Sequence, residues 1–248
     1  MKSLFMAGSA ALALTLAACG GGGNTTNAGT PVASAPVANV AAPNGGDWTQ
    51  VVSETERGFL MGNPNAPVKL VEYASLTCPH CRDFSREAMT PLRENYVDSG
   101  KLSWEFRSFP LNPIDVSATL LATCQGPGPF FKLVEQSYQE QDKWVLPFQQ
   151  LTKPQQDQLA RVPQAEQFAA LAKAGGLDNF YRVRGLPEAK AQACLTDKAK
   201  IDAIVAMRDR GIKDDKVEGT PTFLINGNKV DQPPTWTALE PELKKAGA

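Results

Sequence analysis

The feature that most constrains this chain is Cys78-Pro79-His80-Cys81, two thiols that directly follow an apolar run from Val68 to Ala74. A Cys-X-X-Cys at the junction of a strand and a helix is typical of a redox dithiol. The unpaired N–H groups and positive dipole end of the helix favour a thiolate, so Cys78 is the predicted nucleophile and Cys81 its resolving partner. Pro79 suits the first helical position because it lacks an N–H. His80 is expected to donate a hydrogen bond to the Cys78 sulfur.

Three other interpretations of the two thiols compete with a redox dithiol. A closed zinc site needs about four ligands, whereas His80 is the only histidine and the other cysteines are isolated. Covalent attachment of haem needs a histidine directly after the second cysteine, where Arg82 stands. A purely structural disulfide across one helical turn remains the third alternative. We therefore expect no metal and no cofactor apart from the redox-active disulfide Cys78–Cys81.

The N-terminus has the features of an export signal. Lys2 precedes an apolar run from Leu4 to Ala18 that is too short for a membrane span. The stretch that ends at Cys19 resembles the bacterial lipobox, which implies cleavage before Cys19 and lipidation of that residue. Residues 1–18 are thus predicted to be a lipoprotein signal peptide that is removed; cleavage without lipidation is the alternative. By the same resemblance, Gly20 would permit sorting from the inner to the outer membrane.

The composition after the signal peptide separates a segment that cannot fold from a segment that can. Residues 20–46 carry no charge and almost no large apolar side chain, so they cannot bury enough surface to fold. We predict a lipidated flexible tether over 19–50 and one folded domain over 51–248, which is long enough for a single core. The whole chain has 25 Lys and Arg residues against 26 Asp and Glu residues and no basic block. Binding of nucleic acid is therefore not supported.

Two cysteines remain once Cys19 is assigned to lipid and Cys78 and Cys81 to redox chemistry. Cys124 and Cys194 form an even pair in an oxidising compartment, so a structural disulfide between them is expected. The alternative is a buried free thiol, because Cys124 shares a helical face with apolar residues.

Periodicity predicts an α/β fold. The stretch 68–74 is apolar on both faces, as in a central strand covered on both sides, and a helix kinked at Pro91 follows it. Alternation over 102–109 predicts a strand parallel to the first. Helical patterns then fill about 113–213, including a helix over 188–209, before a strand at 222–225, an Asn226-Gly227 hairpin turn and a helix at 236–245.

Together these motifs resemble the DsbA-like thiol-disulfide oxidoreductases of bacterial envelopes, in their lipoprotein and alphaproteobacterial branch. The resemblance is carried by Glu72-Tyr73-Ala74 before the Cys-Pro-His-Cys motif, by the helical insertion and by Gly219-Thr220-Pro221-Thr222-Phe223. It covers the whole folded part and implies a thioredoxin-like fold with a large helical insertion at about 113–213.

The resemblance assigns roles to three further residues. It makes Pro221 the cis-proline that faces the redox cysteines, and it makes Thr220 the residue that offers backbone groups to a substrate; an ordinary trans proline at a strand start is the alternative. Thr220 also resembles the disulfide isomerase relatives. Glu72 is implied to be a buried acid beneath the dithiol that exchanges a proton with Cys81. An acid at the exposed end of its strand is the alternative.

The implied function is disulfide formation or exchange in exported proteins by a membrane lipoprotein that faces the periplasm. Its partners would be cysteine-containing client proteins and a membrane redox partner that reoxidises or reduces it. We expect a monomer, because no added dimerisation domain is visible. The alternatives are an isomerase or reductase that is kept reduced and a redox-inert binding or chaperone module.

Overall fold

The computed structural model describes residues 38–248. The predicted signal peptide at 1–18, the lipidation site Cys19 and the tether up to residue 37 lie outside the described residues and stay predictions. Among residues 38–248, no helix has the length and apolar character that a membrane crossing requires.

One mixed sheet forms the centre of the fold, with strand order β1-β2-β4-β3-β5-β6. Only β3 and β4 are parallel, as the sequence predicted; every other neighbouring pair in this sheet is antiparallel. The short antiparallel strands β1 and β2 were not predicted. The strands are β1 (Val52–Glu54), β2 (Phe59–Gly62), β3 (Val68–Ala74), β4 (Leu102–Ser108), β5 (Thr222–Ile225) and β6 (Asn228–Lys229).

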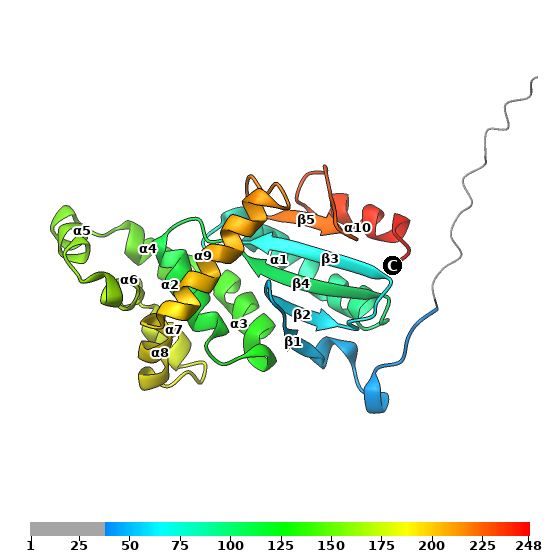
Figure 1. Cartoon of the computed structure of the whole chain (residues 1–248), viewed down its shortest axis with the longest axis horizontal. Helices are drawn as coiled ribbons and strands as arrows, with labels where there is room; N and C mark the ends of the chain where they lie inside the picture. Colours follow the sequence, from blue (N-terminus) through cyan, green and yellow to red (C-terminus); the bar gives the residue numbers. More distant parts are fainter. Residues whose placement is uncertain (1–37) are drawn as a thin grey trace, which may run out of the picture. The chain divides into compact units, whose positions relative to one another are not determined.

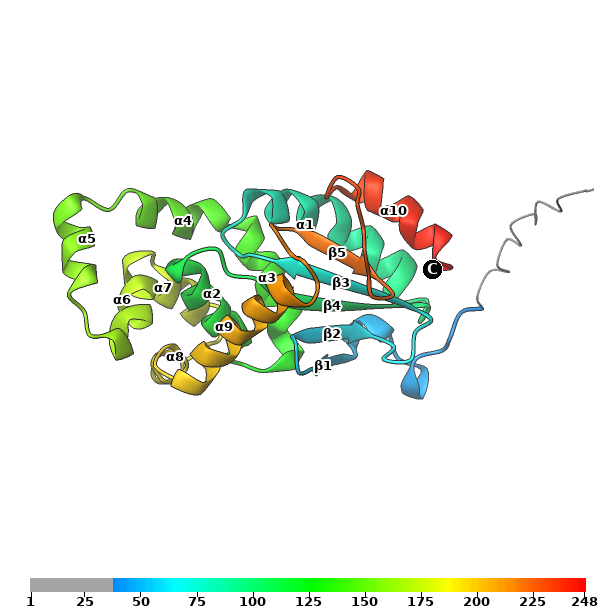
Figure 2. The same ribbon diagram turned by 45° about the horizontal axis from the view of Figure 1, so that its top comes forward.

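Helices cover both faces of the sheet. Helices α1 (Pro79–Pro91), α3 (Pro127–Gln139) and α10 (Trp236–Lys245) cover one face, and α9 (Lys198–Lys213) crosses the other (Figures 1 and 2). Side chains of β3 alternate between the two layers. Leu70 belongs to the large core on the α1 side, and Tyr73 belongs to a smaller cluster with Val217. Because both faces are covered, β3 is apolar at nearly every position.

The prolines and asparagines seen in the sequence shape local structure. Helix α1 ends at Pro91, where a π-helical segment, η3 (Leu92–Val97), continues it; proline removes a helical N–H donor and so changes the bonding pattern. In the β5–β6 hairpin, Asn226 and Gly227 both have positive φ, 51° and 81°. This is the turn that Asn-Gly favours, because its twist matches that of the strands.

A helical insertion separates β4 from β5. It begins with α2 at Pro113 and ends with α9 at Lys213. The predicted helix over 188–209 is wrong as one element, because Asp197 accepts hydrogen bonds from the backbone N–H groups of Ala199 and Lys200 and so starts a new helix. The remaining elements are α2 (Pro113–Thr123), α4 (Gln141–Gln149), α5 (Lys153–Ala160), η4 (Gln164–Glu166), α6 (Gln167–Ala174), α7 (Leu177–Arg182) and α8 (Glu188–Leu195).

Part of the segment assigned to the tether packs on the domain. It contains two short 3₁₀ turns, η1 (Pro43–Gly45) and η2 (Trp48–Gln50). Trp48 is only 6% exposed, and its Nε1 donates a hydrogen bond to the Val40 carbonyl at 2.7 Å. The Val40 N–H in turn donates to the Ser99 carbonyl at 2.9 Å. The folded domain therefore begins before residue 51, where the sequence predicted its start. Burial of the Trp48 indole stabilises the folded state and so makes this segment part of the domain.

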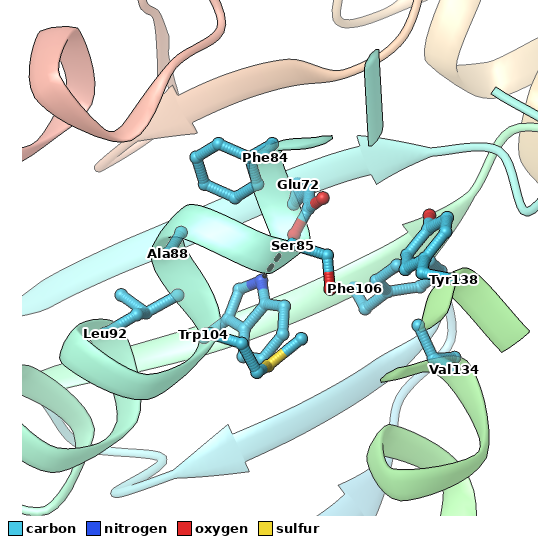
Figure 3. Close-up of a pocket in the computed structure, with 10 residues that line it drawn as sticks. Glu72, Phe84, Ser85, Ala88, Leu92, Trp104, Phe106, Val134 and Tyr138 are labelled. Atoms are coloured by element: carbon cyan, nitrogen blue, oxygen red, sulfur yellow. Dashed lines mark hydrogen bonds between the residues drawn. The ribbon is translucent and has the colours of Figure 1, made fainter. Parts of the chain in front are cut away.

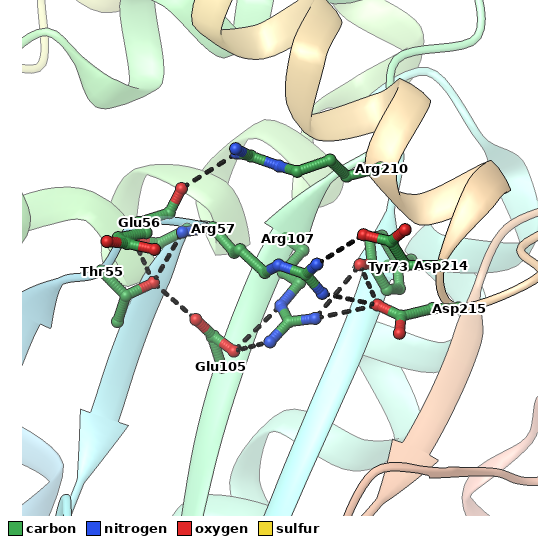
Figure 4. A network of polar contacts seen from close by, with 10 residues as sticks. Thr55, Glu56, Arg57, Tyr73, Glu105, Arg107, Arg210, Asp214 and Asp215 are labelled. Atoms are coloured by element: carbon green, nitrogen blue, oxygen red, sulfur yellow. Dashed lines mark hydrogen bonds and ion pairs between the residues drawn. The ribbon is translucent and has the colours of Figure 1, made fainter.

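A polar network fixes the end of α9 to the sheet (Figure 4). Asp215, just beyond α9, accepts hydrogen bonds from Arg107 of β4 and Arg57 of the β1–β2 turn, each at 3.1 Å. Tyr73 of β3 also donates to Asp215, at 2.5 Å. The network lies on the α9 face of the sheet, away from Cys78. It joins the end of the helical insertion to the strands β3 and β4.

Candidate active site

Cys78 occupies the N-cap of α1, at the end of the loop that leaves β3. Its backbone is extended, with φ −77° and ψ 123°, and Pro79 takes the first helical position. Cys78 and Cys81 are buried, 4% and 0% exposed, whereas Pro79 and His80 are exposed. Both cysteines are free thiols here. Because Cys78 and Cys81 are separated by one helical turn, their sulfurs lie side by side.

The surroundings of Cys78 favour its thiolate. The pKa of Cys78 is lowered to about 5, and the main cause is a hydrogen bond from the Cys81 thiol. Burial opposes this shift by raising the pKa. The Thr220 side chain and the backbone N–H groups of Cys81 and His80 lower the pKa further. Hydrogen bonds to a charged acceptor are the strong ones. Cys78 is thus suited to be ionised at neutral pH.

Cys81 has the opposite environment. Burial, followed by its hydrogen bond to Cys78, raises the pKa of the Cys81 thiol well above its ordinary value. One sulfur is therefore an attacking or leaving thiolate, and the other stays protonated until a base takes its proton.

The His80 side chain does not lie where the sequence predicted. The ring is exposed, and no hydrogen bond joins it to Cys78 within residues 38–248. His80 instead contributes its backbone N–H, which any residue at this position would supply.

Thr220 and Pro221 lie next to Cys78, 142 residues away in sequence. The Cys78 thiol donates a hydrogen bond to the Thr220 carbonyl at 3.3 Å. The Thr220–Pro221 peptide bond is cis, so the trans alternative does not describe this structure. Of the residues predicted at the reacting sulfurs, the structure thus brings Cys81 and Thr220 against Cys78, with Pro221 directly after Thr220, whereas the His80 ring makes no such contact.

Glu72 is buried on the α1 side of β3, together with Leu70. It is 2% exposed, and its Oε2 accepts a hydrogen bond from Trp104 Nε1 at 3.1 Å. Figure 3 shows the carboxylate beside Phe84 and Ser85 in a small, largely apolar cavity. Burial raises the pKa of Glu72 to about 8, although the indole bond lowers it. The alternative of an exposed strand end is therefore wrong.

Glu72 also acts on Cys81 through its charge. The nearby carboxylate is one of the causes that raise the pKa of the Cys81 thiol. A carboxyl group with a pKa near neutral can accept or return a proton at physiological pH.

Cys124 and Cys194 form a disulfide with an S–S distance of 2.01 Å and Cα atoms 5.9 Å apart. The bond joins the C-terminal end of α2 to α8 within the insertion. The alternative of a free Cys124 thiol is therefore wrong.

Three residues of the insertion that contact the redox loop were missed. Asp115, Tyr138 and Gln141 hydrogen-bond to residues between Ser75 and Cys78. They lie between 38 and 65 residues from their partners in sequence. The sequence around Asp115 gives only a local signal. An acid that follows Asn112-Pro113 is typical of the first turn of a helix, and this pattern predicts the start of a helix rather than a functional site.

Comparison with known proteins identifies the family. A family model described as Thioredoxin matches residues 54–245, so the chain belongs to the thioredoxin family. A crystal structure titled protein-disulfide isomerase from Novosphingobium aromaticivorans is 32% identical with a TM-score of 0.72, and the match covers 76% of this chain and 97% of that one. Wolbachia pipientis alpha-DsbA1 is 28% identical with a TM-score of 0.54, over 67% and 73% of the two chains.

Curated relatives include a Rickettsia prowazekii protein named "Putative protein-disulfide oxidoreductase", 26% identical over 69% of this chain and 55% of that protein. The chain thus spans about half the length of the curated Rickettsia relatives it matches. The predicted thioredoxin-like fold with a helical insertion is confirmed, as is the resemblance to DsbA-like proteins. The Rickettsia relatives also support the alphaproteobacterial branch.

Proposed function

We propose that the chain is a thiol-disulfide oxidoreductase that exchanges disulfides with exported proteins through Cys78 and Cys81. The observation that carries the proposal is the split between the two sulfurs. The pKa of Cys78 is lowered to about 5 and that of Cys81 is raised. A structural disulfide needs no such difference, whereas exchange needs one ionised and one protonated thiol. The family and its disulfide-exchanging relatives support the same chemistry.

In the oxidising direction, a client thiolate attacks the Cys78 sulfur of the Cys78–Cys81 disulfide. That bond breaks, a mixed disulfide between client and Cys78 forms, and Cys81 leaves as a thiolate that takes a proton from Glu72. A second client thiolate then attacks the client sulfur of the mixed disulfide, and Cys78 leaves as a thiolate. The client loses two electrons and the cysteine pair gains them. A membrane redox partner that accepts those electrons would restore the disulfide.

The oxidising direction is favoured by the stabilised Cys78 thiolate. Stabilisation of the reduced form raises the reduction potential of the cysteine pair, because the reduced protein is then the preferred product. Hydrogen bonds to that thiolate come from the chain itself, chiefly from the Cys81 thiol and from the backbone N–H groups at the start of α1.

A second candidate is a disulfide isomerase or reductase that another membrane partner keeps reduced. Thr220 before Pro221 favours it, as does the similar Novosphingobium protein, whose title is protein-disulfide isomerase. A redox-inert module that binds clients is the third possibility, in which the cysteine pair would be permanently oxidised.

Alkylation of the living cell's thiols separates the three functions. Rapid acid quenching followed by a mass-tagged maleimide reports the state of Cys78 and Cys81. A mostly oxidised pair that glutathione reduces readily supports the oxidase, and a mostly reduced pair supports the isomerase or reductase. An oxidised pair that glutathione does not reduce contradicts both enzymes.

The place of action follows from the N-terminal sequence. The lipobox-like stretch before Cys19 supports a lipid anchor, and the export signal predicted before it, together with the similarity to Wolbachia alpha-DsbA1, supports a periplasm-facing position. We propose a monomeric lipoprotein of the cell envelope. Metabolic labelling with an alkyne fatty acid, compared between wild type and Cys19→Ala, tests the anchor: label that persists in the variant contradicts it.

A further inference from the structure

The helical insertion holds the loop that carries Cys78. This redox loop, Ser75 to Cys78, connects β3 to α1. The Tyr138 hydroxyl of α3 donates to the Ser75 carbonyl at 3.1 Å. The Gln141 side chain donates twice from its Nε2, to the Leu76 carbonyl at 2.8 Å and to the Cys78 carbonyl at 3.0 Å. Two side chains of the insertion thus hold three carbonyl groups of the loop backbone.

Asp115 of α2 holds the same loop from another side. It is fully buried, and its carboxylate accepts hydrogen bonds from the backbone N–H groups of Leu76 and Leu111, each at 3.0 Å. The Ser75 hydroxyl also donates to it. The redox loop and the β4–α2 loop therefore share one acceptor, and the insertion supplies it.

Among these side chains of the insertion, Gln141 is the one that bonds to the backbone of Cys78 itself. It is 3% exposed, and its amide orientation is unambiguous, because the opposite one would face an oxygen toward two carbonyl oxygens. The next residue, Asp142, pairs with Arg82 of α1 at 3.1 Å. The start of α4 is therefore joined both to the loop before Cys78 and to the helix after it.

The position of the Cys78 backbone determines how its sulfur meets the helix. The thiolate depends in part on the backbone N–H groups of His80 and Cys81. Hydrogen bonds weaken steeply as their angle worsens. The carbonyls of Leu76 and Cys78 lie on either side of the Thr77–Cys78 peptide, so a group that holds both restricts the rotation that aims the sulfur at those donors.

We propose that Gln141, assisted by Tyr138, is a positioning residue for the Cys78 thiolate: it holds the redox loop where the first N–H groups of α1 meet the sulfur. This inference rests on the proposed function and extends it, because it makes the insertion part of the redox machinery.

The test replaces Gln141 by Met, which has a similar length but no donor. The thiolate absorbance of the reduced full chain is titrated against pH, and its equilibrium with glutathione is measured. Gln141→Met is expected to raise the thiolate midpoint by about 1 pH unit, the size of one weakened bond to a charged acceptor. The glutathione equilibrium should shift about tenfold toward the oxidised protein.

Trp144→Phe is the matched control. Trp144 lies on the same helix, is 1% exposed, and donates from Nε1 to the Ser137 carbonyl at 3.1 Å, away from the redox loop. Its loss should lower stability and leave the Cys78 titration unchanged. If Gln141→Met also lowers stability but keeps a wild-type midpoint and glutathione equilibrium, the positioning role is wrong.

Tyr138→Phe provides the test if Gln141→Met does not fold. It removes one donor to the loop and keeps the ring, so the thiolate midpoint should rise, by less than for Gln141→Met. A midpoint equal to that of the wild type would contradict the proposal. A wild-type protein that exchanges no disulfide would instead contradict the proposed function, and the two failures are thereby distinguished.

Discussion

The indole N–H of Trp104 donates to the Glu72 carboxylate at 3.1 Å, and this is the only protein hydrogen bond to that carboxylate among the described residues. The neighbouring strands β3 and β4 thus place an acid and a single donor in an apolar layer. One hydrogen bond does not offset the loss of hydration, so the acid favours its protonated form, which is the form that the proposed proton transfer to Cys81 requires.

Replacement of Glu72 by Gln should change how stability depends on pH. Because the pKa of Glu72 is raised from 4.5 to about 8 in the folded state, the folded protein retains a proton that the unfolded chain loses. The free energy of unfolding should therefore fall as pH rises from about 4.5 to about 8, by on the order of a few kcal/mol. Urea unfolding of the oxidised protein, in which the cysteines do not titrate, should show this fall in wild type and a weaker one in Glu72→Gln. Identical pH profiles would contradict the buried-acid role.

Removal of the structural disulfide should destabilise the domain. The bond closes a loop of 70 residues, and the chain-entropy account gives about 4 kcal/mol for a loop of that length. The double variant Cys124→Ala/Cys194→Ala should lose an amount of this order in urea unfolding and retain a low Cys78 pKa, because neither residue contacts the redox loop. Wild-type stability in the variant would show that the bond contributes little.

Thr220 should matter more than His80 to the Cys78 thiolate. The Thr220 side chain lowers the pKa of Cys78 directly, whereas His80 contributes only its backbone N–H. Thr220→Val should raise that pKa and make the protein a weaker oxidant, and His80→Ala should have the smaller effect. Titration of both reduced variants checks the order. A larger shift in His80→Ala would mean that the ring reaches the sulfur in solution.

Exchange should depend on the two cysteines in different ways. Cys78→Ser should abolish oxidation of a reduced, unfolded secreted protein, because no sulfur remains to form the mixed disulfide. Cys81→Ser, given a substrate that already holds a disulfide, should accumulate a mixed disulfide, because the Cys78 thiolate attacks the substrate bond and no Cys81 thiol remains to resolve the adduct. Non-reducing electrophoresis distinguishes the two variants, and activity that survives in Cys78→Ser would refute its assigned role.

Local sequence signals were sufficient for the elements that carry the reacting groups. The continuous apolar run of β3, the Cys78-Pro79 helix start and the Asn226-Gly227 turn each indicate their structure within a few residues. The strands β1 and β2 were missed because they are short, and the Asp197 cap was missed inside a continuous helical pattern.

The contacts that depend on the tertiary fold could not be predicted. Neither the Gln141 contact with Cys78 nor the exposure of His80 has a signal in spacing or composition. Trp48 gave a partial signal, because a tryptophan is unusual in a free tether, but its partner Val40 is defined only by the fold.

Titration of the Cys78 thiolate in the reduced wild-type protein tests the account most directly. The absorbance of the thiolate near 240 nm, compared with that of Cys78→Ser, isolates this sulfur. A midpoint near pH 5 is expected, because the hydrogen bond from Cys81 and the other donors lower the pKa of Cys78 to about 5. A midpoint near 8.5, the ordinary value for a free cysteine, would contradict it.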